Sequence, residues 1–179
     1  EGPAVGCSFS NCGDFFATGG ADSIVMVWQS NINYMSEEFE KLTNIKCSLV
    51  IPKDDLQLSS NKSTAIFRIF QEALTNISKH AGASQVHVTL ADLDQIILLE
   101  IGDNGRGITN ADMEKHDSFG IRGMRERCQQ LKGSFHISGG PDEGTKVTIL
   151  IPKGENILST QEAIDFEIEI NREYFANHS

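Results

Sequence analysis

The sequence predicts an α/β domain at its centre, and three features of residues 36–153 lead to this prediction. A helical pattern runs from Ser63 through Ala81, with apolar residues three and four positions apart, and closes at Gly82. Two pairs of β-type runs follow, and the turn-forming residues between the members of each pair predict two antiparallel hairpins. These runs are residues 84–90, 95–101, 134–137 and 145–151.

The remaining central elements follow from caps and breakers. Residues 36–42 begin with a serine followed by acidic residues, which predicts a short helix. Residues 47–51 form an apolar run ended by Pro52, which predicts a strand. Residues 124–131 predict a helix that ends before Gly133. The apolar face of the long helix is expected to comprise Ile66, Ile69, Phe70, Ala73, Leu74 and Ile77.

Charge divides the chain into three parts. Residues 1–35 carry three acids and no Lys or Arg, residues 36–153 carry 16 acids and 14 bases, and residues 154–179 carry six acids and one Arg. Only the middle part has the balanced charge of a self-contained enzyme domain, so we expect domain boundaries near residues 36 and 153. A net charge of −10 argues against a nucleic-acid-binding surface, which would need a basic stripe.

Membrane contact is not expected either. No apolar run approaches the roughly 20 residues that a membrane span needs, and no charged-then-apolar leader opens the sequence. We therefore expect a soluble, cytoplasmic protein.

The N-terminal part predicts three short strands, over residues 4–9, 15–18 and 24–28, separated by turn-forming residues. This segment resembles most of one blade of a WD-repeat propeller, as in centriolar WD-repeat proteins. One blade cannot close a ring that typically needs four to eight. Residues 1–35 are thus expected to be an appendage or an interaction arm that adds strands to a partner.

Four polar residues share one face of the long predicted helix, namely Glu72, Asn76, Lys79 and His80. The amide oxygen of Asn76 suits a hydrated Mg²⁺, which takes few protein ligands. Lys79 and His80 can meet phosphate charge, and Glu72 could hold or activate an attacking group. A solvated polar stripe on an amphipathic helix is the alternative.

The second predicted hairpin strand continues into Asp103-Asn-Gly-Arg-Gly107. Gly105 and Gly107 lack side chains, so backbone there could closely approach a bound base. An ordinary Asx turn with glycines would show the same residues.

A third motif, Gly120-Ile-Arg-Gly123, precedes Met-Arg-Glu-Arg. Backbone amides at a glycine-led helix start suit phosphate, and Arg122 adds positive charge. Residues 108–119, polar and without a clear period, are expected to form a mobile lid.

In this order, and with Gly144-Thr145 near the end, these motifs resemble the ATP-binding catalytic domain of bacterial sensor histidine kinases. The branch most similar to them contains nitrate sensors and lipid-fluidity sensors. The resemblance covers residues 36–153 and implies an α/β sandwich, a mixed β-sheet packed on helices, as in the GHKL (Bergerat) fold of gyrase and Hsp90. It implies ATP and Mg²⁺ as cofactors, with Asn76 as metal ligand. It also implies that Asp103 accepts a hydrogen bond from the adenine amino group and that Thr145 supports Asp103.

The resemblance further implies γ-phosphoryl transfer to a histidine on a separate dimerisation domain, followed by a response regulator. None of the five histidines has the helical surroundings of a phosphoacceptor. We therefore expect ATP binding without unaided self-phosphorylation. Two alternatives stay open: a GHKL-type ATP hydrolase with Glu72 as base, and a non-enzymatic scaffold that uses the blade-like segment.

Overall fold

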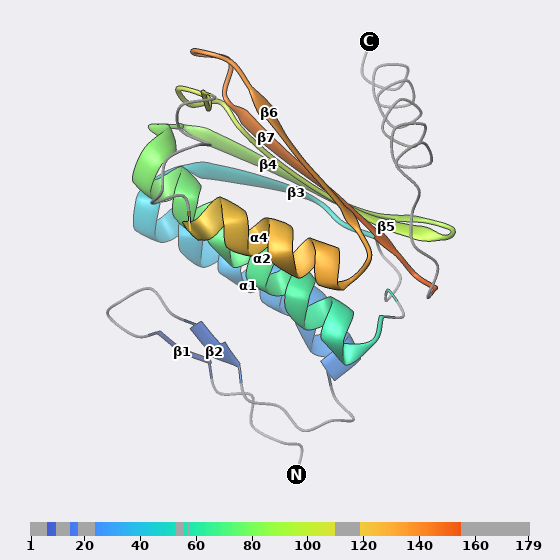
Figure 1. Ribbon diagram of the computed structural model, residues 1–179. Coiled ribbons are helices and arrows are strands. Elements are labelled where there is room, and N and C mark those ends of the chain that lie inside the picture. The colour runs from blue at the N-terminus through green and yellow to red at the C-terminus, as the bar shows by residue number, and fades with distance from the viewer. Residues whose placement is uncertain are drawn as a thin grey trace.

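The central part of the molecule is a two-layer sandwich, with a β-sheet on one side and helices on the other (Figure 1). The computed structural model describes residues 7–9, 15–17, 24–52, 56, 58–109 and 119–154. Five strands form the sheet in the order β3-β4-β5-β7-β6. Their bounds are β3 Lys46–Val50, β4 Gln85–Leu93, β5 Ile96–Asp103, β6 Ser134–Gly139 and β7 Thr145–Pro152.

The sheet is mixed, because β3 pairs with β4 in parallel whereas the other three pairings are antiparallel. The two predicted hairpins, β4 with β5 and β6 with β7, are confirmed. Pairing of β5 with β7 places the most buried strands at the centre. Alternate residues of β5, namely Ile97, Leu99 and Ile101, are each 1% exposed and belong to the core that the helices share.

The helical layer consists of α1 (Ile24–Thr43), α2 (Ser60–Asn76) with its extension η1 (Ile77–Ala81), and α4 (Phe119–Gln130). All six residues of the apolar face predicted for the long helix are buried. Among them, Ile66, Ile69 and Phe70 have no exposed surface. The helix ends at Gly82, which adopts the left-handed conformation with φ of 61°, as the closing glycine predicts.

The predicted strand at residues 24–28 and the predicted helix start at Ser36 are both wrong, because α1 runs without a break through both positions. Ser36 is buried within the helix, where its hydroxyl donates to the Ile32 carbonyl over 2.8 Å rather than capping a first turn. Ile32 and Met35 belong to the same core as α2, so tertiary packing outweighs the β propensity of the preceding run.

The helical period was present in the sequence. Trp28, Ile32, Met35 and Phe39 are spaced by four, three and four residues, which is the spacing of one helix face. A strand that ends at Trp28 interrupts this spacing, so the strand prediction is incompatible with one continuous helix.

The blade-like prediction loses its third strand in consequence. β1 (Cys7–Phe9) and β2 (Phe15–Ala17) do form, and they pair with each other in an antiparallel, separate two-stranded sheet. A propeller blade needs four strands. The resemblance of residues 1–35 to a WD-repeat blade is therefore not supported.

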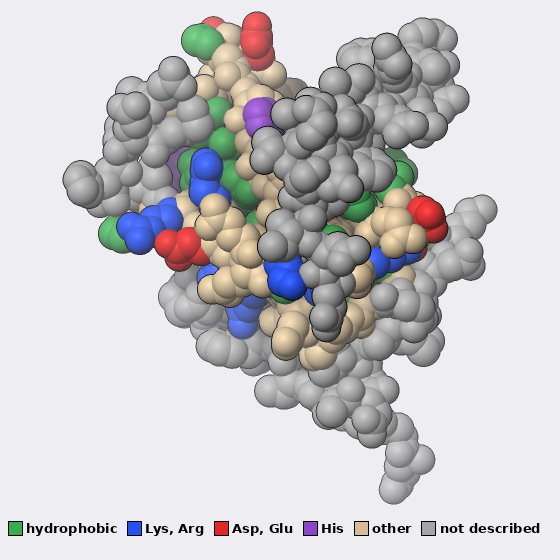
Figure 2. All heavy atoms as spheres, turned by 45° about the vertical axis from the view of Figure 1, so that its right-hand side comes forward, with side chains coloured by type: hydrophobic (Ala, Val, Ile, Leu, Met, Phe, Trp, Pro, Cys, Tyr) green, Lys and Arg blue, Asp and Glu red, His purple; other side chains and the backbone are tan. Residues whose placement is uncertain are grey.

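The surface of the described part agrees with its balanced charge. On the face in Figure 2, Lys and Arg side chains are scattered among acidic and uncharged ones rather than gathered into a stripe. Within the described ranges, no helix combines the length and apolar character that crossing a membrane requires. Most of the predicted lid and the tail after Gly154 lie outside the described residues.

Candidate functional site

A cavity opens between α2, α4 and the sheet, at the end of the sheet where β5 ends and β7 begins. Its walls are mostly aliphatic, with three polar residues among them, and this composition is typical of small-molecule sites. The lining residues are Ala73, Asn76, Ile77, Ala81, Ile101, Asp103, Ile108, Ile121, Met124, Ile137, Thr145 and Val147. Three predicted site residues that are distant in sequence, Asn76, Asp103 and Thr145, therefore meet in one cavity.

Asp103 is the half-buried carboxylate of this cavity. Its Oδ1 accepts a hydrogen bond from the Gly105 amide over 2.8 Å, and the Thr145 amide also donates to the carboxylate. Burial raises the pKa of Asp103, and these two hydrogen bonds oppose the rise. The carboxylate is thus held in place by backbone donors and still borders the cavity.

The glycines around Asp103 are required by close packing of the chain's own backbone. A Cβ on Gly105 would clash with the Ala81 carbonyl. Gly107 and Gly144 have φ of 77° and 78°, where other residues are strained. A side chain on Gly144 would clash with the backbone carbonyl of Asp103. The absence of side chains at these glycines therefore lets other backbone segments of this protein pack closely, and this packing fixes the loop geometry beside the cavity.

Two residues of the same motif have roles that sequence analysis missed. The side-chain oxygen of Asn104 accepts hydrogen bonds from the amides of Ser84 and Gln85, each over 2.9 Å. The Nε of Arg106 donates to the His80 carbonyl over 2.8 Å. Both residues belong to the motif at residues 103–107. Their hydrogen-bond partners are 19 to 26 residues away in sequence, so local patterns could not predict these bonds.

Asn76 and Glu72 lie at the junction of α2 and α4. The Nδ2 atom of Asn76 is buried, and it has no hydrogen-bond partner among the described residues. A Cβ on Gly120 would stand 3.2 Å from this atom and would clash with Oε1 of Glu72. The absence of a side chain at Gly120 therefore allows α4 to pack closely against Glu72 and Asn76. Glu72 lies next to the cavity but does not line it.

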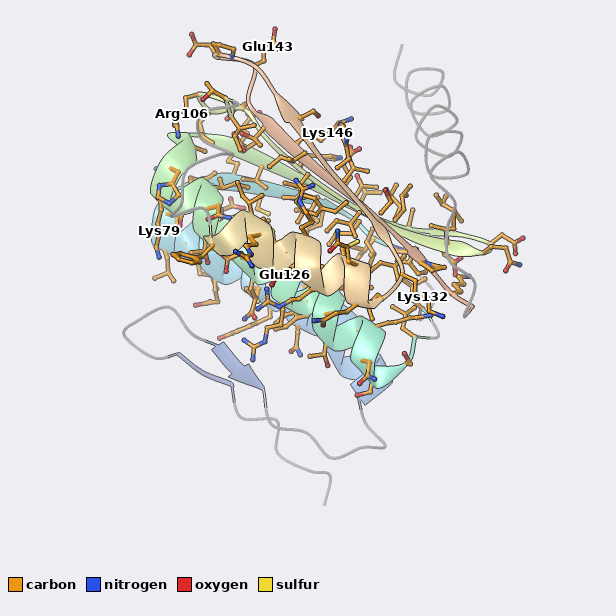
Figure 3. All side chains as sticks on the ribbon, viewed as in Figure 1. Lys79, Arg106, Glu126, Lys132, Glu143 and Lys146 are labelled. Carbon is orange, nitrogen blue, oxygen red and sulfur yellow. The ribbon has the colours of Figure 1, made fainter. Side chains whose placement is uncertain are left out.

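Lys79 and His80 do not line the cavity either, and both are exposed. The prediction that they share one helix face with Asn76 depends on α-helical periodicity through residue 80. However, residues 77–81 form a π-helical turn, whose i→i+5 hydrogen bonds shift the following side chains off that face. Lys79 lies at the end of the molecule where α2 terminates (Figure 3).

The motif at residues 120–123 lies inside the first turn of α4, which begins at Phe119, five residues before the start of the helix predicted at residues 124–131. Arg122 points along the helix to Glu126, with an Nε–Oε1 distance of 2.8 Å, and its side chain is 75% exposed. Gly123 packs beside the guanidinium of Arg127, 2.9 Å from a hypothetical Cβ to Nη1. Neither Arg122 nor Gly123 lines the cavity.

A family model described as histidine kinase-, DNA gyrase B- and HSP90-like ATPase matches residues 61–155, which is more than half of the chain. This range includes every predicted site residue. It starts in α2 and extends just past β7.

Curated relatives are similar to more than half of the chain. Sensor protein VraS of Staphylococcus aureus is 37% identical over 98 residues, covering 55% of this chain and 28% of VraS. VraS of Staphylococcus epidermidis is 36% identical over 104 residues, covering 57% of this chain and 30% of the relative. The chain thus spans less than a third of the length of these relatives.

Solved structures show the same fold. The histidine kinase domain of the blue-light activated kinase EL346 from Erythrobacter litoralis superposes with a TM-score of 0.63 at 21% identity, over 76% of this chain and 65% of that one. Histidine kinase AdeS of Acinetobacter baumannii gives 0.60 at 16% identity, over 72% and 64%. Together with the family match, these findings show that the chain belongs to the histidine kinase-, DNA gyrase B- and HSP90-like ATPases and carries an ATP-binding domain homologous to that of sensor histidine kinases.

Proposed function

We propose that this chain supplies the ATP-binding catalytic domain of a two-component sensor histidine kinase. The observation that supports this most directly is Asp103, a carboxylate fixed by two backbone amides at the edge of an aliphatic cavity. An adenine ring would lie between the aliphatic walls and donate its amino hydrogen to this carboxylate. Guanine has an acceptor at the equivalent position and would be disfavoured.

The polar groups beyond the base would serve the phosphates. The buried Nδ2 donor of Asn76 has no partner among the described residues, and a buried polar group normally needs one. This fits a ligand that brings a hydrogen-bond acceptor, such as a phosphate oxygen of ATP. The Oδ1 atom of the same amide would be the ligand for Mg²⁺, which binds oxygen and takes few protein ligands. When bound, the cation would neutralise phosphate charge. Lys79, His80, Arg122 and the amides at the start of α4 would add positive potential.

Glu72 would orient or activate the histidine that accepts the γ-phosphoryl group. It lies one helical turn before Asn76 and touches the start of α4 at Gly120, so it is near the site without lining the base cavity. Catalysis in this class depends mainly on positioning and charge stabilisation. We propose that the acceptor histidine lies on a separate dimerisation domain, and that a cytoplasmic response regulator receives the phosphoryl group next.

Within this function we favour the branch that includes nitrate sensors and lipid-fluidity sensors, on the basis of the Gly-x-x-Gly-Met-Arg-Glu-Arg string at residues 120–127. We propose that the ATP-binding unit ends near residue 153. Because Ile32 and Met35 belong to the common core, we propose that it begins within α1, before the limit predicted at residue 36.

Titration of the purified chain with ATP and with GTP, each with and without Mg²⁺, tests the function. We expect ATP to bind more tightly than GTP and Mg²⁺ to strengthen ATP binding. Equal affinity for ATP and GTP would contradict the role of Asp103, and absence of nucleotide binding would overturn the proposal.

A further inference from the structure

The turn that follows α2 is held at its end by a residue from another segment. Residues 77–81 form a π-helical turn, and such turns are rare and often occur at functional sites. Arg106 binds the last two carbonyls of this turn. Its side-chain Nε donates to the His80 carbonyl over 2.8 Å, and its backbone amide donates to the Ala81 carbonyl over 2.9 Å.

Arg106 also contacts a third segment. Its own carbonyl accepts a hydrogen bond from the Asp142 amide, over 3.0 Å, in the turn between β6 and β7. Arg106 thus connects the end of the helix that carries Asn76, the loop that follows Asp103, and the turn that precedes Thr145. Figure 3 shows Arg106 and Lys79 at the same end of the molecule.

The two halves of Arg106 act on different groups. Its backbone hydrogen bonds are independent of the side chain and hold the loop after Asp103. Only the guanidinium reaches the His80 carbonyl, whereas the backbone amide holds the Ala81 carbonyl, so the side chain adds a second restraint on the turn that carries Lys79 and His80. Ile77 and Ala81 anchor the two ends of the turn in the core, whereas Lys79 and His80 between them are exposed. The bond to the His80 carbonyl therefore restrains the exposed part of the turn.

We propose that Arg106 is a positioning residue whose guanidinium holds the turn at residues 77–81 in register with the adenine site. This role rests on the proposed function, and it goes beyond that function by separating recognition of the phosphates from recognition of the base. Loss of the guanidinium would loosen the turn that carries Lys79 and His80, the two side chains proposed to add positive potential for the phosphates. The cavity around Asp103 would be unaffected.

The test compares the full chain with its Arg106→Ala and Arg106→Lys variants, titrated with adenosine and with Mg-ATP. In Arg106→Ala we expect ATP affinity to fall roughly five- to tenfold, within the range for loss of one ordinary hydrogen bond, with adenosine affinity within about twofold of the original. Arg106→Lys should recover part of the loss, because an ammonium can still donate to the His80 carbonyl. Lys41→Ala, which removes one exposed charge on α1, is the matched control and should change neither affinity.

Hydrogen exchange without nucleotide provides a second measurement. Amides of residues 77–84 should exchange faster in Arg106→Ala than in the original chain, and less so in Arg106→Lys. Equal losses of adenosine and ATP affinity would show a general structural defect and overturn the role. Unchanged exchange together with full recovery by lysine would show direct charge attraction instead. If the original chain failed to bind ATP, the proposed function and this role would both fall, whereas an original chain that binds and an unaffected alanine variant would overturn this role alone.

Discussion

The two ends of the proposed nucleotide site, which we call the base side and the phosphate side, differ in how far the protein alone fixes them. On the base side, Asp103 is held by two backbone amides, and glycines allow backbone segments to pack against one another. On the phosphate side, Lys79 and His80 are exposed on a π-helical turn, and Arg122 interacts along its own exposed helix surface with Glu126. The base side is therefore preorganised before the ligand arrives. The phosphate side carries exposed charged side chains, and binding of the nucleotide would help to order these side chains.

The largest effect should be on the rate of phosphoryl transfer, when Glu72 is replaced. In Glu72→Gln, phosphoryl transfer to a kinase dimerisation domain supplied separately should slow by roughly 100-fold or more, because an amide cannot act as a base. ATP affinity should stay within about twofold, since Glu72 does not line the cavity. Labelled phosphate on the acceptor and an ATP titration measure the two effects.

Glu38→Gln on the surface of α1 is the control for this experiment and should transfer at the original rate. A Glu72→Gln variant that also transferred normally would leave Glu72 as a packing partner of Gly120 only.

Preorganisation of the base side should depend next on Gly144. An alanine there must adopt φ near 78° and would clash with the Asp103 carbonyl, so Gly144→Ala should cost about 3 kcal/mol of unfolding free energy and abolish ATP binding. Denaturant unfolding and nucleotide titration measure both losses. Gly102→Ala is the matched control, because a Cβ at Gly102 meets nothing within 4 Å. Equal stability of the two variants would show that the loop adapts and is not preorganised.

Base selectivity should depend on the Asp103 carboxylate. Asp103→Asn reverses part of the hydrogen-bond polarity at the base edge, so ATP affinity should fall at least tenfold, corresponding to about 1.5–3 kcal/mol, and the preference over GTP should collapse. The same change at Asp94, in the turn at the other end of the β4–β5 hairpin, should leave affinity unchanged. Unaltered ATP binding in Asp103→Asn would remove the adenine assignment.

Replacement of Asn76 should affect ATP binding in a way that depends on Mg²⁺, unlike replacements on the base side. Asn76→Ala should weaken Mg-ATP by roughly five- to tenfold and metal-free ATP by much less, because the amide would contact the cation and not the base. Asn61→Ala, at the exposed start of the same helix, is the control. Equal weakening with and without Mg²⁺ would make Asn76 a structural residue of the α2–α4 junction.

The smallest effect should be a pH dependence on the base side. Burial raises the pKa of Asp103, so its carboxylate should gain a proton at a higher pH than an exposed aspartate does. ATP affinity should then fall as pH decreases from neutral through the raised pKa of Asp103, and Asp103→Asn should lack this component. Titrations across pH with both proteins isolate it from titration of the phosphates. Identical profiles would show that Asp103 does not titrate in this range.

The contribution of Asp103 to the free energy of unfolding should depend on pH in the opposite direction to its contribution to ATP affinity. A carboxyl group whose pKa rises on folding binds its proton more tightly in the folded state, so it favours folding at low pH and that contribution is lost as pH rises through the raised pKa. The stability of Asp103→Asn relative to the original chain should therefore be greater near pH 7 than near pH 4. Denaturant unfolding at the two pH values measures the difference.

Periodicity and turn residues determined most of the central fold. The apolar face of α2, its end at Gly82, and both hairpins follow from local spacing and glycine chemistry, because each depends on residues near one another in sequence. The motifs likewise identified Asn76, Asp103 and Thr145, which do line one cavity. Local signals failed at residues 24–28, where packing of the following helix turn onto α2 decided for helix.

Only the tertiary structure decided which of the candidate residues meet. Whether a side chain faces the cavity depends on the phase of the helix that carries it, and the π-helical turn changes that phase after Asn76. The partners of Asn104 and Arg106 are set by contacts between segments far apart in the chain. The sequence by itself thus determined the two hairpins, the long helix and the residue types of the proposed site. Long-range packing determined that backbone amides hold Asp103 and that Lys79 and His80 are exposed.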